Sequence, residues 1–189
     1  MSRVSEIRRE PMYTLALIGH SNLPKIVNYA DVIVECFKCP EAKLTDVTNP
    51  EKFDQRMLHR RWDCVILFLG GEDLAECRDQ KVIFDRFVAV LDVLNARKVL
   101  LTDLEPRTYS SRLEERYGIN TQDYNNLKDI VNKRLQRYSK RSQRFQLVHV
   151  PPAYQNDTWN GILLGEDGQE SLVLKYLHLI KEHREKTGR

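Results

Sequence analysis

The chain has 189 residues, of which 41% are hydrophobic and 30% are charged. This length fits one domain with one sizeable core, and the composition is that of a globular protein. No apolar stretch approaches the roughly 18 residues that span a bilayer, and no signal-peptide pattern opens the chain, which argues against a membrane protein. The formal net charge is only +3, so the distribution of charge along the chain is more informative than its total.

Residues 1–12 are polar and basic, and we expect them to form a tail before a single domain over residues 13–186. The cysteines are Cys36, Cys39, Cys64 and Cys77. The first two form a C-x2-C pair, but a structural zinc site needs a second pair of ligands at similar spacing, which the sequence lacks. We therefore expect reduced cysteines in or beside strands, no metal, no cofactor, and a cytosolic or nuclear protein.

Short apolar runs alternate with amphipathic stretches along the chain. Buried strands are expected at residues 13–19, 31–37, 63–69, 98–102 and 145–150. Helices are expected at residues 22–30, 49–59, 80–96 and 121–138, the last with Thr121 as N-cap, and from near Asp167 onward. Residues 106–119 are expected to be irregular. The alternation predicts an α/β fold, a three-layer doubly wound sandwich with a five-stranded parallel sheet.

In open parallel sheets, sites form at the carboxyl ends of the strands. Segments that fall there include Gly19-His20-Ser21 after the first strand and Gly70-Gly71-Glu72-Asp73 after the third. A third segment, residues 160–168 (NGILLGEDG), precedes the last helix. Together, in this order, these segments resemble the motifs of the SGNH (GDSL-type) hydrolases over residues 14–179, which implies an SGNH-like fold.

The resemblance also implies that the catalytic triad has been lost. Ser21 stands at the family's nucleophile, but the triad Asp position reads Asn160 and the His position reads Leu163. A hydroxyl is a poor nucleophile unless a base takes its proton, and a leucine cannot do so.

The oxyanion-binding positions are altered in the same way. Glu41 stands where the family has a glycine whose N–H binds the oxyanion, and Glu72 stands where it has an asparagine. An ionised carboxylate only accepts hydrogen bonds and repels a developing oxyanion. We therefore expect a chain that is not an enzyme, with Ser21, Glu72, Asn160 and Leu163 as vestiges.

Another histidine could in principle replace the base. His149 and His178 are candidates by sequence, but His149 is expected within a strand, satisfied in or near the core, and His20 should point away from its neighbour Ser21. An SGNH-type esterase with Ser21 as nucleophile, lipase-like or retrotransposon-encoded, therefore stays as the alternative function. A protein–protein scaffold is a further alternative.

A basic run marks the second half of the chain. No Asp or Glu lies between Ile130 and Asn156. The run contains Lys133, Arg134, Arg137, Tyr138, Lys140, Arg141 and Arg144. Several of these cations share a helix face, and Tyr138 could stack on an unpaired base. A second cluster has Arg60 and Arg61, and Lys25 lies near the family's active-site rim. Basic residues near a helix C-terminus also favour the helix dipole, so a solvated face is the alternative interpretation.

The missing triad, the size and the basic skew are similar to the Oskar-type domains, the catalytically degenerate SGNH-like domains of insect Oskar proteins. This resemblance implies a non-catalytic RNA-binding domain that acts in germ-plasm ribonucleoprotein assembly and mRNA localisation. It further implies RNA as a partner, single-stranded or structured, as in mRNA untranslated regions, together with germ-plasm proteins. The net charge of only +3 favours modest binding to such RNA over tight duplex binding. The implied location is cytoplasmic ribonucleoprotein granules, with no membrane partner.

Overall fold

A five-stranded parallel sheet forms the centre of the computed structural model, which describes residues 12–19, 31–104, 106–107, 111–149, 158–159, 163–164 and 166–188. Its strands are β1 (Tyr13–Gly19), β2 (Val32–Lys38), β3 (Trp62–Phe68), β4 (Ala96–Thr102) and β5 (Phe145–Val148), in the order β2-β1-β3-β4-β5. Each neighbouring pair is parallel. The predicted parallel α/β sheet is confirmed.

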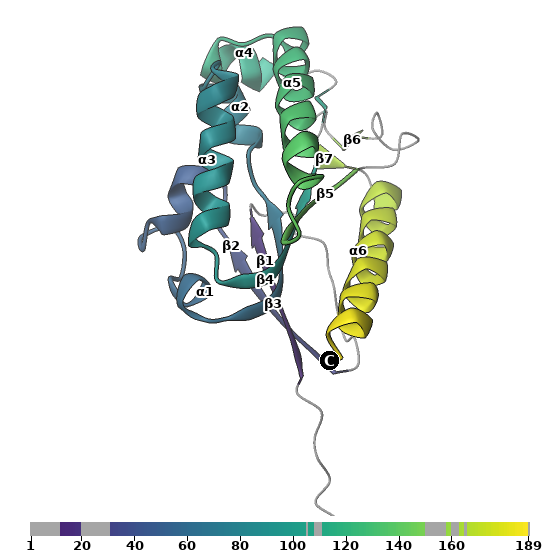
Figure 1. Cartoon of the computed structure of the whole chain (residues 1–189). Coiled ribbons are helices and arrows are strands. Elements are labelled where there is room, and N and C mark those ends of the chain that lie inside the picture. The colour runs from purple at the N-terminus through teal and green to yellow at the C-terminus, as the bar shows by residue number, and fades with distance from the viewer. Residues whose placement is uncertain are drawn as a thin grey trace, which may run out of the picture.

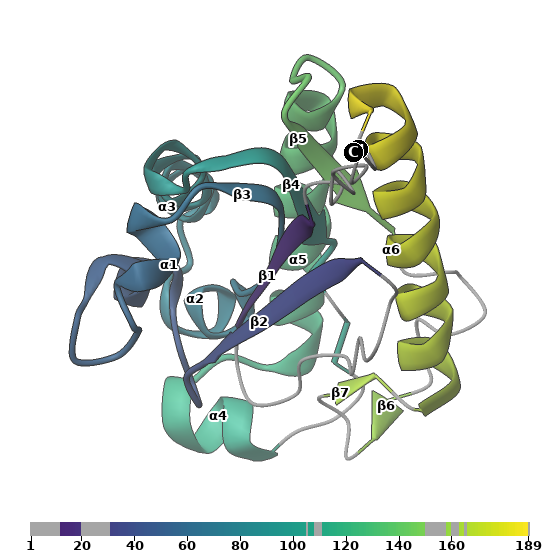
Figure 2. The ribbon, with the colours of Figure 1, turned by 90° about the horizontal axis from the view of Figure 1, so that it is seen from below.

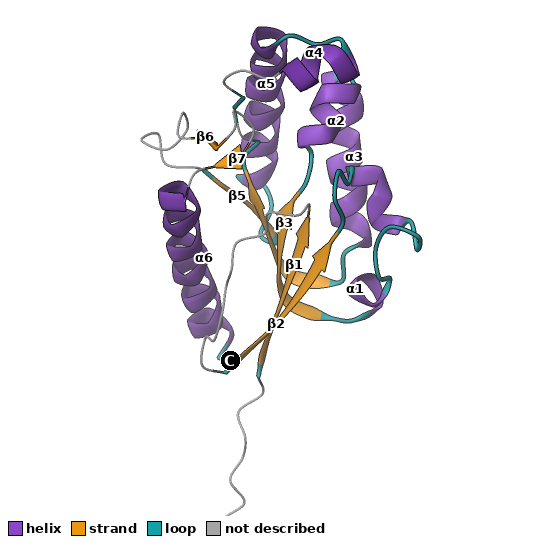
Figure 3. Ribbon diagram, turned by 180° about the vertical axis from the view of Figure 1, so that it is seen from behind, coloured by secondary structure: helices purple, strands orange, loops and turns teal. Residues whose placement is uncertain are grey.

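Helices cover both faces of the sheet (Figures 1 and 2). On one face lie α3 (Gln80–Val93) and α5 (Thr121–Ser139), and on the other lies α6 (Glu166–Thr187). The shorter elements are η1 (Leu44–Thr48), α1 (Arg56–His59), α2 (Gly71–Glu76), α4 (Ser111–Tyr117) and the antiparallel pair β6 (Thr158–Trp159) and β7 (Leu163–Leu164). The view from behind shows α6 on the side of the sheet opposite to α3 and α5 (Figure 3).

Strand alternation separates the core into two halves. In β1, Leu15 and Leu17 pack toward Tyr176 of α6, whereas Ala16 and Ile18 belong to the cluster that includes Phe87 of α3. Successive strand residues point to opposite faces, so an uninterrupted apolar strand feeds both halves. Each fully buried large apolar side chain contributes about 1.5–3 kcal/mol of transfer free energy, which holds the three layers together.

Some predicted elements are wrong. The helix expected over 49–59 is reduced to α1, because Asn49 Oδ1 and Asp54 Oδ1 accept the N–H groups two residues on, at 3.0 and 2.9 Å, and form turns instead. The 106–119 stretch is not wholly irregular, since it contains α4. Asn120, not Thr121, caps α5, because its Oδ1 accepts the Asp123 N–H at 2.8 Å.

One predicted helix cannot be compared with the structure, and the bounds of two other predicted elements differ. The helix expected at residues 22–30 lies outside them. The helix expected at 80–96 ends at Val93, and β4 begins earlier than expected, at Ala96. Among the described residues, no helix has the length and apolar character to cross a membrane.

The cysteines differ in exposure, which gives a chemical test of the fold. Cys36 in β2 is exposed, whereas Cys64 in β3 is buried, and burial raises the pKa of the Cys64 thiol to about 12. Because the thiolate is the reactive form, Cys64 should resist alkylation at pH 8 in the folded protein while Cys36 reacts. Timed iodoacetamide labelling with peptide mass spectrometry checks this, and the same labelling in urea should modify both. Equal rates for the two cysteines in the folded protein would contradict the placement of β3.

Candidate nucleic-acid interface

The carboxyl edge of the sheet is where the sequence predicts the remnant of a hydrolase site. Ser21, Lys25 and Asn160 lie outside the described residues. Leu163 begins β7, where its backbone pairs with Trp159. Glu41 and Glu72 are described, so the edge can be assessed at the two positions predicted to replace the oxyanion-binding groups.

Gly70 sets the geometry of the turn that presents Glu72. Its φ is +115°, and a Cβ there would come within 2.4 Å of the Phe87 ring and 2.8 Å of Leu104. Both the backbone conformation and the close packing therefore require glycine. The turn leads directly into α2, a helix that was not predicted from the sequence.

Glu72 is held by groups that use both carboxylate oxygens. The Tyr117 hydroxyl donates to Oε2, and Nη2 of Arg107 lies 3.6 Å from Oε1. Arg107 is itself buried, with its guanidinium 4.6 Å above the Tyr124 ring. Burial, and then the hydrogen bond to Glu72, raise the pKa of Tyr117 to about 12, so the phenol stays a donor at neutral pH. This position carries a fixed acceptor rather than an oxyanion donor.

Glu41 shows the same replacement on the neighbouring loop. Its φ is +55°, a left-handed conformation that glycine adopts most easily, which fits its alignment with a family glycine. Its carboxylate forms a two-pronged pair with Arg116, with N–O distances of 2.6 and 2.9 Å. Arg116 and Tyr117 both belong to α4, so this helix is tied across the loops after β2 and β3.

His149 corrects another expectation, because it is neither inside a strand nor in the core. It follows the end of β5, its side chain is 51% exposed, and its Nδ1 lies 3.2 Å from Asp103 Oδ2. The ends of β1 and β5 are three strand spacings apart, roughly 14 Å. This separation argues against His149 as a replacement base for a nucleophile that follows β1. His178 is exposed on α6, where its Nε2 lies 3.4 Å from Glu182.

The second half of α5 and the turn after it carry the predicted basic run. Lys133, Arg137, Lys140 and Arg141 all have exposed side chains. We call these four residues the α5 basic face. Within the part of the chain that the structure describes, none of them forms an ion pair with a carboxylate. Lys133 and Arg137 lie one turn apart on the same side of the helix. Lys140 and Arg141 follow its last residue, Ser139, so the four cations extend over about 12 Å.

Three other members of the predicted set point inward. The Arg134 guanidinium lies 5.4 Å from the Phe84 ring, and Tyr138 packs between Phe84 and Phe145 at centroid distances of 5.9 and 5.6 Å. Arg144 donates through Nε to the Ala96 carbonyl at 2.8 Å and through Nη2 to the Leu94 carbonyl. These side chains hold α5, β5 and the end of α3 together, so we leave them out of the α5 basic face.

Structural comparison connects this geometry to known folds. A GDSL-like lipase from Bacteroides thetaiotaomicron superposes with a TM-score of 0.62 at 16% identity, covering 92% of this chain and 88% of that one. A member of the lipolytic protein G-D-S-L family from Veillonella parvula gives 0.65 at 12%, covering 89% and 98%. The chain has an SGNH-hydrolase-like fold.

A carbohydrate acetylesterase from Sinorhizobium meliloti gives a TM-score of 0.60 at 14% identity, covering 89% of this chain and 100% of that one. No protein-family model matches the sequence, and no curated protein matches it either. At these identities the likeness establishes the fold, including the five-stranded sheet that the sequence predicted. It leaves the activity to be argued from the residues.

The turn that presents Lys140 and Arg141 is held in place by hydrogen bonds. Ser139 Oγ accepts the Leu147 N–H at 3.0 Å, and Ser142 Oγ accepts the Phe145 N–H at 2.9 Å. The two hydrogen bonds that Arg144 donates to the carbonyls of Ala96 and Leu94 hold the end of this turn against residues 94–96. Cations on a fixed turn lose less conformational freedom on binding than cations on a free tail.

Arg144 therefore has an expected role that differs from that of its basic neighbours. Arg144→Met removes two hydrogen bonds to backbone carbonyls and should lower the free energy of unfolding by about 1–3 kcal/mol. The salt dependence of RNA binding should stay unchanged, because the side chain makes no phosphate contact in this account. Urea unfolding and anisotropy at two salt concentrations measure both. A lower salt slope without a stability loss would place Arg144 on the RNA surface after all.

The second basic cluster, Arg60 and Arg61, lies at the amino-terminal edge of the sheet, where the turn after α5 also lies. Only part of this cluster is available to a ligand. Arg60 is paired with Glu35, and its guanidinium lies 4.6 Å from the Trp62 ring. Arg61 is exposed directly before β3, whereas Lys140 and Arg141 precede β5. The amino-terminal ends of β3 and β5 are separated by β4, so Arg61 lies about 10 Å along the edge from the α5 turn and can extend its surface.

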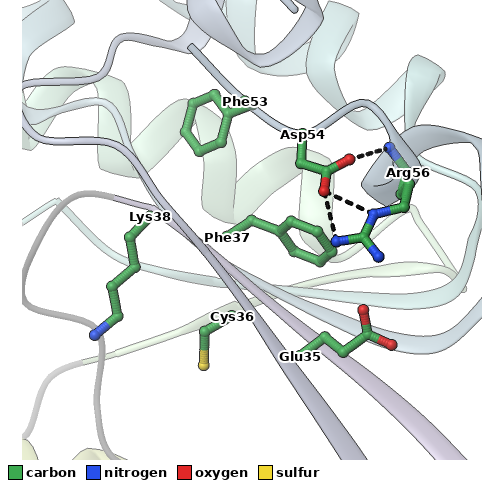
Figure 4. A pocket seen from close by; sticks show the side chains of 7 residues that line it. All are labelled: Glu35, Cys36, Phe37, Lys38, Phe53, Asp54 and Arg56. Carbon is green, nitrogen blue, oxygen red and sulfur yellow. Dashed lines mark hydrogen bonds and ion pairs between the residues drawn. The ribbon is translucent and has the colours of Figure 1, made fainter.

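A cavity of about 310 Å³ lies beside the edge strand β2, and no residue of the α5 basic face lines it (Figure 4). Phe37 and Phe53 line it together with Glu35, Asp54 and Arg56. Asp54 and Arg56 bind each other through hydrogen bonds of 2.7 and 2.9 Å, so these two charges are already satisfied. Among the described residues, no group of three or more His, Cys, Asp or Glu side chains is placed to hold a metal ion.

Proposed function

We propose that this chain is a non-catalytic RNA-binding domain on an SGNH-hydrolase scaffold. The observation that carries the proposal is the α5 basic face, which has four exposed cations on the second half of a helix and the turn after it. None has an acidic partner among the described residues. Cations that are not neutralised by the protein attract phosphates, and phosphate contacts supply most sequence-independent affinity for nucleic acids. A solvated face would place acidic residues among the basic ones, as the first half of α5 does with Asp123 and Asp129.

The carboxyl edge supports a role without catalysis. The sequence has Asn160 and Leu163 at the triad positions. Glu41 and Glu72 carry negative charge where acyl transfer develops an oxyanion, and each is engaged by arginine. Removing a single oxyanion donor costs roughly 10²–10³ in rate, and replacing it by a carboxylate is worse.

The resemblance to Oskar-type domains supplies the biological part of the proposal. It assigns the domain to germ-plasm ribonucleoprotein assembly and mRNA localisation in cytoplasmic granules. The RNA would be single-stranded or structured, as in mRNA untranslated regions, and germ-plasm proteins would be further partners. The α5 basic face binds the RNA, and Arg61 extends it.

Two assays on the same preparation test the proposal. Fluorescence anisotropy with labelled RNA at 0.05 and 0.2 M salt should give saturable binding that weakens with salt, for the wild type and for Ser21→Ala alike. Hydrolysis of p-nitrophenyl acetate should stay at the rate of the uncatalysed reaction for both. Absence of RNA binding at low salt would overturn the proposal. Ester hydrolysis that Ser21→Ala abolishes would establish the alternative, an SGNH-type esterase.

A further inference from the structure

The aromatic side chains that the structure describes are buried or only partly exposed. Of the Phe, Tyr and Trp side chains that the structure describes, none is exposed. The exposed large apolar residues in the same part of the chain are all aliphatic: Met12, Val82, Val93, Ile130 and Leu174. Proteins that bind single-stranded RNA stack its bases on exposed aromatic rings, and each stacked base is worth about 1–3 kcal/mol.

The rings nearest the α5 basic face are already in contact with protein groups. Tyr138 packs edge-on against Phe84 at 5.9 Å and is tilted against Phe145 at 5.6 Å. The Arg134 guanidinium lies 5.4 Å from the Phe84 ring centroid, and Phe145 is buried. Phe84 and Tyr138 are only partly exposed, so a base could reach no more than the remaining part of either ring. The face therefore offers cations and aliphatic carbon, including the 43% exposed Ile130, and no described stacking platform.

We infer that the α5 basic face recognises the sugar–phosphate backbone of double-helical RNA rather than unpaired bases. This inference rests on the proposed function and specifies its ligand. Double-stranded RNA is recognised mostly by shape and by phosphate and 2′-hydroxyl contacts, which need no stacking. A duplex also presents phosphates more densely along its axis than a single strand does. A rigid row of cations about 12 Å long gains from that density, whereas it gains nothing from exposed bases.

The salt dependence distinguishes the two kinds of ligand. With four phosphate contacts, the logarithm of the affinity should fall against the logarithm of salt concentration with a slope of about −3.6 for a duplex and about −2.8 for a single strand. For ligands that bind equally at 1 M salt, this difference in slope makes the duplex about six-fold tighter at 0.1 M salt. Micromolar dissociation constants suit a site with so few contacts.

The experiment compares a labelled 20-base-pair RNA duplex with each of its single strands, by anisotropy at four salt concentrations. A second duplex of different sequence measures base dependence. The inference predicts that the duplex binds about six-fold more tightly than either strand and that the two duplexes agree within two-fold. Arg137→Glu/Arg141→Glu should weaken all of these complexes together.

Each outcome bears on a different claim. Tighter binding of a single strand, or a large difference between the two duplexes, would overturn the backbone inference and leave the RNA-binding function standing. Failure of duplex and single strands alike to bind at the lowest salt would overturn the proposed function itself. Equal affinity for duplex and strand, with equal slopes, would also contradict the inference, because charge density would then have no effect.

Discussion

Replacing Arg137, Lys140 and Arg141 together by Glu is expected to weaken RNA binding by at least about 100-fold at 0.1 M salt. The three side chains are exposed and have no ion-pair partner among the described residues, so their charge is available to phosphate. With a duplex, each lost phosphate contact removes about 0.9 from the slope of log affinity against log salt concentration, and three contacts remove about 2.7. The added carboxylates then repel the RNA further. Anisotropy titration over a range of salt concentrations measures both the affinity and the slope.

A matched variant controls for net charge. Lys38, Lys52 and Lys181 are also exposed, and none lies on the α5 basic face. Their replacement by Glu changes the charge of the chain by the same amount but should weaken binding far less, because only the long-range attraction falls. Circular dichroism should show both variants folded. Equal losses in the two variants would mean that binding depends on overall charge, and the α5 basic face would lose its assigned role.

Asp73→Ala is expected to lower the free energy of unfolding by about 3 kcal/mol and the melting temperature by roughly 6–12 °C. Asp73 is fully buried in the Gly-Gly-Glu-Asp motif, where it accepts the Leu44 N–H at 2.8 Å and binds Arg86 at 2.9 Å. Truncation leaves a buried N–H and a guanidinium without their acceptor. The motif thus has a structural aspartate, and thermal unfolding with urea titration measures its contribution.

Two controls separate the causes. Asp85→Ala removes an exposed ion pair with Lys81 and should cost less than about 0.5 kcal/mol. Asp73→Asn keeps an acceptor for the Leu44 N–H and should cost less than Ala. Burial raises the pKa of the Asp73 carboxyl more than its partners lower it. Its contribution to stability is therefore largest at low pH, and the wild-type advantage over Asp73→Asn should grow as the pH falls from 7 to 4. A constant difference over that range would contradict the raised pKa.

The sheet could be predicted from the sequence because buried parallel strands are continuous apolar runs. Residues 13–19 and 63–69 have that character, and both became strands. The short elements could not be predicted in the same way. Whether 49–59 is one helix depends on the side-chain turns at Asn49 and Asp54, and α4 is fixed by contacts of Arg116 with a loop distant in sequence. The hydrophobic periodicity of a short stretch of sequence shows neither effect.

The position of the candidate interface could be predicted from the sequence, but the residues that belong to it could not. A run of basic residues without acids is visible in the sequence, and helical spacing groups Lys133 with Arg137. Only packing shows that Tyr138 and Arg144 face the protein, since β5 and the end of α3 supply their partners. For Tyr138 the sequence does contain an indication. Tyr138 follows the buried Leu135 by three residues, which places it on the side of α5 that faces the core.

The most direct test is to locate the bound RNA on the chain. Ultraviolet crosslinking of the wild-type protein to 4-thiouridine-labelled RNA, followed by peptide mass spectrometry, identifies the residues in contact. The account predicts crosslinks within residues 130–144, and with lower yield near Arg61. Crosslinks confined to the carboxyl edge, around residues 39–42 and 70–73, would contradict it, because the hydrolase position itself would then be the binding site.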